Sequence, residues 1–255
     1  MKVKLISYSK PHLDSFWQYG ENLEGISDNF QVTVEGQDEP ILKNGAVQEL
    51  IAFCARVSNP SNQINSETSE KLIKYLIKHA HWSPLEMVSA CLEIETTRDI
   101  ARQILRHRSF SFQEFSQRYA DPASLGEQFV LREARLQDTK NRQNSIEIDI
   151  NTDEGRRLAW MWEEQQKRVI AVAKEAYEWA ISAGIAKEQA RAVLPEGNTK
   201  SKMYMNGTLR SWIHYIDLRS SNGTQKEHME IARTCAEVIA KIFPLAKELS
   251  CGAEN

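Results

Sequence analysis

The chain has 255 residues, of which 41% are hydrophobic and 26% are charged, and this length is enough for one substantial core. Its formal net charge of -3 creates no overall field that would attract a polyanion, so phosphate recognition must come from a local patch. Bulk binding of nucleic acid is therefore disfavoured. Four cysteines without a C-x-x-C pair favour free thiols in a reducing compartment. With no signal-peptide core and no apolar run near the roughly 20 residues of a spanning helix, we expect a cytoplasmic protein with no membrane partner.

The first 45 residues predict an extension ahead of the main helical part of the chain. The stretch KVKLISYS at residues 2–9 alternates well enough to be an opening strand. The polar, glycine-containing residues 19–45 predict a loop-rich segment. We assign no role to residues 1–45, but we expect one domain over residues 1–255.

Helices and a strand are predicted next. Apolar residues recur at helical spacing over residues 46–57 and over 72–80, and Pro84 ends the second helical stretch. In VSACLEIE at 88–95 the apolar residues alternate with polar ones, which is the period of a half-buried strand. Residues 98–107 again have the apolar stripe of a helix.

The remaining sequence predicts a helix-rich fold with few strands. QFVLR at 128–132 predicts a short strand, and the polar residues 137–153 predict a loop insertion. Because strands and helices do not alternate regularly, we expect an α+β domain around a small mixed or antiparallel sheet rather than a doubly wound fold. Further helices are predicted over residues 155–182, 187–194, 209–219 and 225–243.

Several common catalytic motifs are absent from the sequence. The 11 glycines form no G-x-G-x-x-G, G-x-x-x-x-G-K-[ST] or G-x-S-x-G motif, so side chains must hold any phosphate. His79 and His81 form an H-x-H pair without a third ligand at useful spacing, and we expect no metal. Cys54 and Cys235 lie on apolar helix faces, and Cys91 lies in a strand beside carboxylates that raise a thiol pKa. We therefore expect no cysteine nucleophile.

The stretch RHRSFSFQEFSQRY at residues 106–119 is the strongest local signal. Arginine guanidinium groups match phosphate oxygens bidentately, and two of them flanking a histidine at a helix end can hold more than one phosphate. Arg191 adds a further cation, as do Arg210, His214 and Arg219, whose offsets place them on neighbouring parts of one helical surface. From the residues alone, a basic solvent-facing strand is the alternative.

Two other classes of function remain open at this point. Phe110, Phe112 and Phe115 are interleaved with the arginines, as in modules that stack single-stranded nucleic acid on aromatic rings. The many helices also fit a plain oligomerisation protein.

The same stretch resembles the signature of the flavin-dependent thymidylate synthases, which is RHR, seven residues and then Ser. Here it runs from Arg106 to Ser116. The resemblance spans about residues 46–245, because further blocks match that family in the same order. They are ARVS at 55–58, KHAHWSPLE at 78–86, ARQ at 101–103, ARAVLP at 190–195 and DLR at 217–219.

The resemblance implies a reaction and a set of partners. Members of this family transfer a methylene group from methylenetetrahydrofolate to dUMP, and reduced FAD, recharged by NADPH, completes the methyl group of dTMP. The reaction proceeds without an enzymic nucleophile, which accounts for the absence of a candidate cysteine. The family also implies a homotetramer with its sites between subunits, and no nucleic-acid partner.

The resemblance assigns roles position by position. Arg219 is the catalytic candidate, because it matches the arginine that favours ionisation of the uracil ring NH. The positions matching dUMP contacts are Gln103, Arg106, Glu114, Phe115, Ser116, Gln117, Arg118, Arg191 and Arg219. Those matching FAD contacts are Ser58, His81, Ser83, Glu86, Arg106, His107, Arg108, Glu114, Thr208, Arg210, His214 and Leu218. The chain departs from the family pattern at Thr208 and His214, where many members have asparagine, and near Gly223, where many have histidine.

Overall fold

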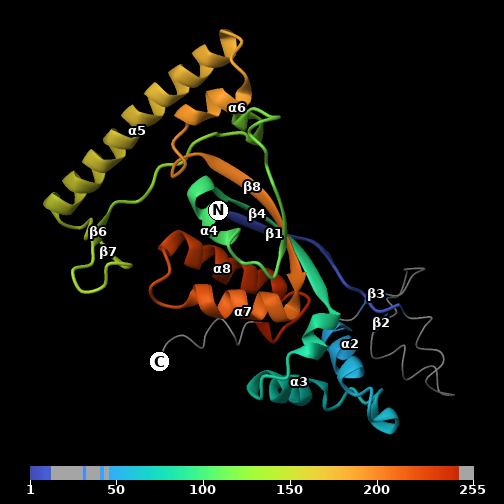
Figure 1. The fold of residues 1–255 in the computed structure, drawn as a ribbon. Helices are drawn as coiled ribbons and strands as arrows, with labels where there is room; N and C mark the ends of the chain where they lie inside the picture. The colour runs from blue at the N-terminus through green and yellow to red at the C-terminus, as the bar shows by residue number, and fades with distance from the viewer. Residues whose placement is uncertain (13–30, 33–40, 43–45, 247–255) are drawn as a thin grey trace. The chain divides into compact units, whose positions relative to one another are not determined.

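Seven α-helices and eight strands make up the part of the chain that the computed structural model describes, which is residues 1–12, 31–32, 41–42 and 46–246 (Figure 1). The predicted α+β class is confirmed. Most of the predicted loop-rich segment 19–45 lies outside the described residues, which contain only the paired strands β2 (Gln31–Val32) and β3 (Ile41–Leu42) from it.

The main sheet has four strands in the order β1-β4-β8-β5. Backbone bonds join the end of one strand to the start of its neighbour, as in Ser9 N to Ser89 O at 2.9 Å and Leu209 N to Val88 O at 2.9 Å, so neighbouring strands are antiparallel. Its strands are β1 (Lys2–Tyr8), β4 (Ser89–Thr97), β8 (Lys200–Thr208) and β5 (Ser111–Glu114).

The predicted helices all form, with some differences at their ends. The helix predicted over 98–107 ends at Ile104, so Arg106 and Arg108 lie beyond its last turn. The helix before Pro84 ends at Lys78, and a separate 3-10 turn begins at Ser83. The helices are α2 (Ala46–Ala55), α3 (Ser69–Lys78), α4 (Arg98–Ile104), α5 (Asp153–Ser182), α6 (Lys187–Ala190), α7 (Leu209–Ser220) and α8 (Lys226–Ile239).

Two predictions in the middle of the chain are wrong. Residues 128–132 do not form a strand, because only Phe129 makes an isolated β-bridge, with Thr199. The predicted loop insertion 137–153 instead contributes to a hairpin of β6 (Arg135–Gln137) and β7 (Ser145–Glu147), and Asp153 already belongs to α5. This hairpin could not be predicted from the sequence, because its strands are short and mostly exposed and so lack an alternating apolar pattern.

Local chemistry sets both ends of the 30-residue helix α5. At its start the Thr152 hydroxyl accepts a hydrogen bond from Gly155 N at 3.1 Å, and a Cβ on Gly155 would lie 2.1 Å from the carbonyl oxygen of Asp149. At its end Gly184 has a φ of 80°, and Ile185 N donates to Ala180 O at 2.9 Å. This is the glycine-ended cap expected of a helix C-terminus.

The described chain forms two compact units. Unit 1 comprises residues 1–3, 93–205 and 219–232, and unit 2 comprises the described residues within 4–92, 206–218 and 233–246. In unit 1 a cluster of Tyr177, Ala180, Ala190 and Leu194 holds α5 against α6. No helix among the described residues is both long enough and apolar enough to cross a bilayer.

The core of unit 2 is built on α7. Its apolar side chains at Leu209, Trp212 and Ile216 are fully buried, and Trp212 Nε1 donates to Ala90 O at 3.0 Å. This burial fixes which face of α7 remains exposed, and Arg210 and His214 lie on that exposed face.

Candidate functional site

The predicted site residues divide between the two units. Every position matched to dUMP lies in unit 1, together with His107 and Arg108. The positions matched only to FAD contacts otherwise lie in unit 2, and they are Ser58, His81, Ser83, Glu86, Thr208, Arg210, His214 and Leu218.

In unit 1, Arg219 and His107 form a hydrogen-bonded pair. Arg219 Nε donates to His107 Nε2 at 2.9 Å, and because a guanidinium only donates, His107 must accept through an unprotonated Nε2. Burial, the charge of Arg219 and the charge of Arg106 lower the pKa of His107 to about 4. A neutral imidazole therefore orients the Arg219 guanidinium.

Four of the predicted arginines form no ion pair with any described residue. They are Arg106, Arg108, Arg191 and Arg219. The predicted arginine Arg118 differs, because its Nε lies 3.4 Å from Glu188 Oε2 at an exposed position. Arg106 and Arg219 both lie close enough to His107 to lower its pKa, and guanidiniums without a carboxylate partner suit an anionic ligand.

Glu114 lies in β5, where other residues orient its carboxylate. Ser201 Oγ on β8 donates to Glu114 Oε1 at 2.9 Å, and the buried Arg98 Nη1 lies 3.8 Å from the same oxygen. Burial lowers the pKa of Arg98 while the charge of Glu114 raises it, and Arg191 is close enough to lower it as well. Glu114 and Arg191 therefore both lie near Arg98.

The segment after β5 makes a tight turn. Phe115 N donates to Lys202 O at 2.8 Å, so this amide continues the sheet and is not available to a phosphate. Tyr119 N donates to Ser116 O at 3.1 Å and closes the turn. The side chain of Gln117 is 2% exposed, and its Nε2 has no hydrogen-bond acceptor among the described residues. An orphaned donor of this kind fits a ligand that carries an acceptor oxygen.

Gln103 on α4 contacts two residues that the sequence analysis does not assign, and one of them contacts a third. Its Nε2 donates to Gln225 Oε1 at 2.8 Å, and its Oε1 lies 3.2 Å from His228 Nδ1. Glu227 Oε2 accepts from Gln225 Nε2 at 2.9 Å. The polar run TQKEH at residues 224–228 is the sequence feature that could have indicated these contacts. Its composition is equally typical of a solvent-exposed helix start, so the contacts could not be predicted from it.

In unit 2 the α7 residues contact the segment after α3. Arg210 Nη1 donates to Glu86 Oε1, and the rings of His214 and Trp82 lie 4.3 Å apart between centroids. The prediction that Arg219 shares this helical surface is wrong. An offset of nine residues is about two and a half turns of helix, so Arg219 faces away from Arg210 and contacts His107 instead.

The remaining unit 2 positions have separate surroundings. Thr208 caps α7, because Ser211 N donates to its hydroxyl at 3.3 Å, and Leu218 is 56% exposed. His81 and Ser83 are exposed beside the end of α3. Ser58 lines a cavity of about 530 Å³ whose wall also includes Arg56 and Tyr75.

The departures from the family pattern have structural counterparts. His214, where asparagine is usual, contacts Trp82 with its ring tilted by 57°. Gly223 has a φ of 92°, a conformation that a histidine side chain would strain. The backbone between α7 and α8 is therefore adapted to glycine.

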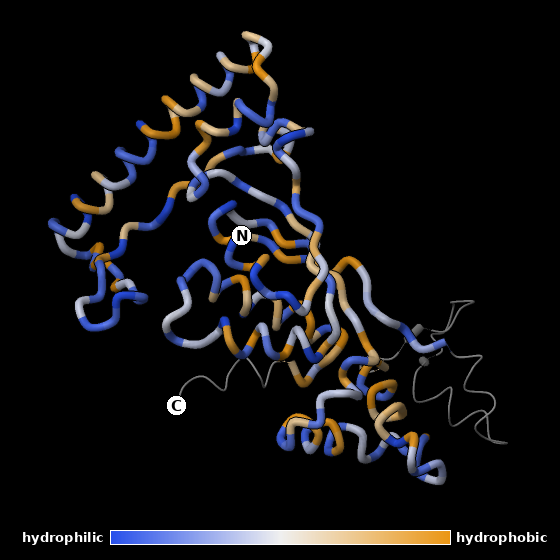
Figure 2. The backbone as a smooth tube through the Cα atoms, viewed as in Figure 1, coloured by the Kyte–Doolittle hydropathy of each residue, from blue (hydrophilic) through white to orange (hydrophobic). Residues whose placement is uncertain are grey.

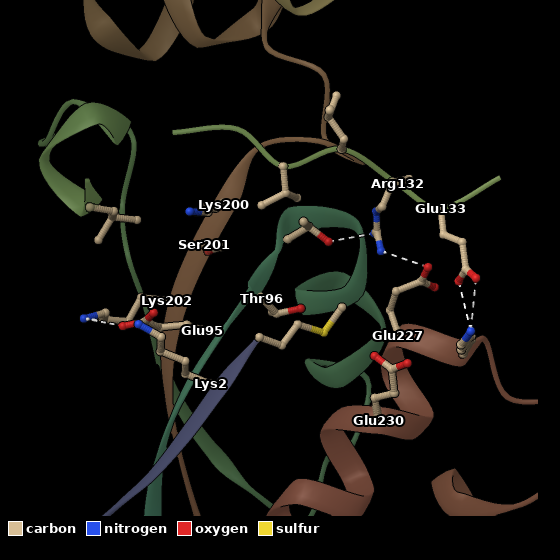
Figure 3. A pocket seen from close by; sticks show the side chains of 16 residues that line it. Lys2, Glu95, Thr96, Arg132, Glu133, Lys200, Ser201, Lys202, Glu227 and Glu230 are labelled. Carbon is tan, nitrogen blue, oxygen red and sulfur yellow. Dashed lines mark hydrogen bonds and ion pairs between the residues drawn. The ribbon is translucent and has the colours of Figure 1, made fainter. Parts of the chain in front are cut away.

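A second, more enclosed cavity of about 370 Å³ lies in unit 1 and contains none of the predicted site residues (Figure 3). Its labelled side chains include lysines and carboxylates, with Arg132 reaching Glu227, and the hydroxyl of Thr96 is buried without a hydrogen-bond partner. This cavity could not be predicted from the sequence, because its lining comes from six separated segments.

The thiols and histidines outside these clusters offer little chemistry. Burial raises the pKa of Cys54, Cys91 and Cys235, so little thiolate forms at neutral pH. His79 and His81 lie 6.3 Å apart between ring centroids, and no group of three metal-ligating residues occurs among the described residues. Cys251 lies outside the described residues.

The phenylalanines of the arginine-rich stretch do not form a row of exposed platforms. Phe110 is only 9% exposed and its ring centroid lies 6.2 Å from that of Phe112. Phe112 and Phe115 are half-buried. The alternative in which all three rings stack on bases therefore does not fit Phe110, which packs in the core.

Comparison with known proteins places this arrangement in a family. A family model described as thymidylate synthase complementing protein matches residues 41–245. A flavin-dependent thymidylate synthase of Synechocystis is 46% identical over 244 residues, which cover 96% of this chain and 96% of that protein. A protein described as a probable flavin-dependent thymidylate synthase of Paramecium bursaria Chlorella virus 1 is 49% identical over 213 residues, covering 83% of this chain and 94% of that protein.

Solved structures agree at the level of the fold. A UMP/dUMP methylase, PolB, from Streptomyces cacaoi, bound with 5-Br dUMP, aligns with a TM-score of 0.70 over 97% of this chain and 93% of its own. Its 23% identity supports a common fold alone. The family model and both relatives confirm the resemblance carried by the RHR signature, and the chain belongs to the flavin-dependent thymidylate synthases.

Proposed function

We propose that this flavin-dependent thymidylate synthase converts dUMP to dTMP with methylenetetrahydrofolate as the one-carbon donor, FAD as the flavin and NADPH as its reductant. Its identity as a thymidylate synthase that uses a flavin rests on the family match. The observation that best supports the assignment of the nucleotide site is the group of four arginines in unit 1 without ion pairs.

We assign dUMP to this arginine group and its neighbours. Arg106 and Arg191 would bind the phosphate, because uncompensated guanidiniums match its oxygens bidentately. Gln117 Nε2 and the Ser116 hydroxyl would donate to further acceptor oxygens of the nucleotide. Glu114, held by Ser201, would accept from a donor group of the ligand.

Arg219 is the proposed catalytic residue. Held by neutral His107 through Nε, it retains its Nη groups for the uracil ring. A cation at that position favours the ionised ring and lowers the pKa of its NH by roughly 1 to 3 units. Loss of the proton from the ring NH makes the ring carbon more nucleophilic, so that it can accept the one-carbon unit without an enzymic thiolate.

The residues present fit a flavin. Within unit 1, Arg106 and Arg108 offer charge without a carboxylate partner among the described residues, which suits a diphosphate. Within unit 2, Trp82 and His214 each offer an aromatic face, which suits contact with a flat ring. Glu86 would fix Arg210 in place through their ion pair. When bound and reduced, the flavin supplies the hydride that completes the methyl group.

We also propose that the protein is a cytoplasmic homotetramer with its sites between subunits. The apolar stripe of α5, which we define as Leu158, Trp162, Val169, Val172 and Trp179, supports self-association. Its members repeat at spacings of three, four and seven residues and are 42–68% exposed. Hydrophobic and hydrophilic residues alternate along α5 in Figure 2. Exposed apolar stripes of this size are usually covered by another protein surface.

The proposed sites can be tested with the purified holoprotein. We expect bound flavin whose visible spectrum shifts on titration with dUMP, and a loss of that shift in Arg191→Ala while the flavin remains bound. Exposed Arg156→Ala on α5, which removes an ion pair with Asp153, is the matched control and should retain the response. Protein that neither contains nor binds FAD would contradict the proposal.

A further inference from the structure

A chain of directed hydrogen bonds runs from a buried carboxylate to Gln103. Glu227 is 7% exposed, Arg135 Nη2 lies 2.6 Å from its Oε1 and Arg132 Nη1 lies 3.4 Å from the same oxygen (Figure 3 shows the Arg132 contact). Burial alone would raise the pKa of Glu227, but hydrogen bonds from Arg135 and Gln225 and the charge of Arg132 lower it. Glu227 is therefore ionised at neutral pH and only accepts hydrogen bonds.

Because Glu227 only accepts hydrogen bonds, it determines the orientation of the side-chain amides of Gln225 and then Gln103. Because Gln225 lies 2.9 Å from Glu227 Oε2, it must present its NH2 group there and its carbonyl oxygen to Gln103. That oxygen lies 2.8 Å from Gln103, which must therefore present its own NH2 group. The opposite orientation of either amide would place two acceptors or two donors face to face.

The same logic reaches His228. With its NH2 group directed to Gln225, Gln103 directs Oε1 towards His228 Nδ1 at 3.2 Å, so this nitrogen must carry the proton. His228 is fully buried, and its ring lies 6.2 Å from that of His107, the residue that orients Arg219. All these residues belong to unit 1.

We propose that Glu227, Gln225 and His228 are positioning residues that fix the amide orientation of Gln103 and thereby its contact with dUMP. This inference rests on the proposed assignment of Gln103 to the dUMP site. A Gln103 amide held from both sides loses less freedom on binding, so the three residues increase dUMP affinity without touching the ligand. One hydrogen of the Gln103 amide nitrogen and one lone pair of Oε1 remain for the nucleotide.

The test uses two substitutions of similar shape at the same buried position. His228→Asn retains a donor near the place of Nδ1, whereas His228→Leu has none. The holoenzyme variants are compared by calorimetric titration with dUMP, by steady-state kcat and KM for dUMP, and by thermal unfolding. His228→Asn should bind dUMP within about twofold of the native chain, and His228→Leu about five- to tenfold more weakly with kcat changed less than twofold.

A second variant tests the other end of the chain. Gln225→Met keeps the length of the side chain but removes its hydrogen bonds to Gln103 and Glu227. It should raise the Kd and KM for dUMP about as much as His228→Leu. Tyr204→Phe removes one hydrogen bond to a buried carboxylate, Glu93, within the same unit and serves as the control with unchanged dUMP affinity.

Three outcomes would count against the account, the first two against this inference and the third against the proposed function. Equal dUMP affinity in His228→Asn and His228→Leu would overturn the inference, since packing alone would then explain the position. A fall in kcat at constant Kd would overturn it too. If the native holoenzyme itself neither binds dUMP nor forms dTMP, the proposed function fails before the variants are compared. If the His228 variants do not fold, the dUMP affinities of Gln225→Met and Tyr204→Phe are compared instead. Equal affinity in these two variants would overturn the inference.

Discussion

Arg219 depends on a histidine that has to be neutral. Its Nε donates to His107 Nε2, and burial together with the charges of Arg219 and Arg106 keeps the pKa of that ring near 4. A protonated His107 would oppose the guanidinium with a second positive charge and a second donor. The geometry around this arginine is therefore maintained at neutral pH and lost only in acid.

Substitution of Arg219 separates catalysis from cofactor binding. Arg219→Ala should lower kcat by about ten- to a thousandfold, because the ring NH of dUMP loses the cation that shifts its pKa by roughly 1 to 3 units. Flavin should stay bound, because Arg219 is not among the positions matched to FAD and, apart from His107 and Arg108, the FAD-only positions lie in unit 2. Steady-state rates and the visible spectrum of the purified variant check this, and loss of flavin would refute the assignment.

Ala80 has an unfavourable backbone conformation at the end of α3. Its φ is 56°, and His81 N donates to Leu76 O at 2.8 Å, as in a glycine-ended helix cap. Gly184 occupies the equivalent place after α5. Ala80→Gly should therefore raise the free energy of unfolding by about 1 kcal/mol. Chemical denaturation measures this, and a lower stability would show that the alanine methyl contributes packing that outweighs the strain.

At the scale of elements, the helices could be predicted from the sequence, because burial of one helix face requires apolar residues at helical spacing. The apolar spacing in α2, α3, α4 and α7 reflects one buried face each, and the strand β4 alternates for the same reason. β8 was missed although Lys200–Thr208 alternates in burial, because its inward residues are Ser201, Met203 and Met205 rather than β-branched ones. Propensity failed where tertiary pairing on both sides determines the strand.

The candidate site was predictable to a different extent. Its arginines could be identified from a contiguous signature, but the Gln225–Gln103 and Arg219–His107 contacts join residues more than 100 positions apart. No local pattern encodes such pairs. The hydrogen-bonded support of the site therefore needed the structure.

The apolar stripe of α5 makes a prediction about assembly. Val172→Glu places a charge in the middle of the stripe and should shift the protein to a smaller species, because burying an unpaired carboxylate in an interface is costly. Lys174→Glu, on an exposed part of the same helix outside the stripe, is the control and should leave the mass unchanged. Light scattering at matched concentrations compares them, and an unaltered mass in both variants would place the interface elsewhere.

For the whole molecule, buried histidines predict acid sensitivity. Burial and the charges of Arg219 and His107 lower the pKa of His228 to about 3, and that of His107 lies near 4, against about 6.5 in the unfolded chain. The unfolded state therefore binds more protons as the pH falls below 6.5, so the free energy of unfolding decreases from there towards pH 3.

The effect of the histidines on the free energy of unfolding occurs in a pH range above that in which carboxylates titrate. Between pH 6.5 and 5 the histidines dominate, and we expect the free energy of unfolding to fall by about 1 to 3 kcal/mol. His228→Leu should remove roughly half of that fall, and denaturant titrations at the two pH values measure it. A stability that stays constant between pH 6.5 and 5 would contradict the buried neutral state of these rings.

The central claim is the reaction, and product formation tests it most directly. The purified protein with FAD, NADPH, dUMP and methylenetetrahydrofolate should yield one dTMP, resolved by chromatography, for each NADPH oxidised in a dUMP- and folate-dependent manner. Omission of the folate should abolish dTMP. Absence of dTMP from the complete mixture, with flavin bound and NADPH available, would contradict the account.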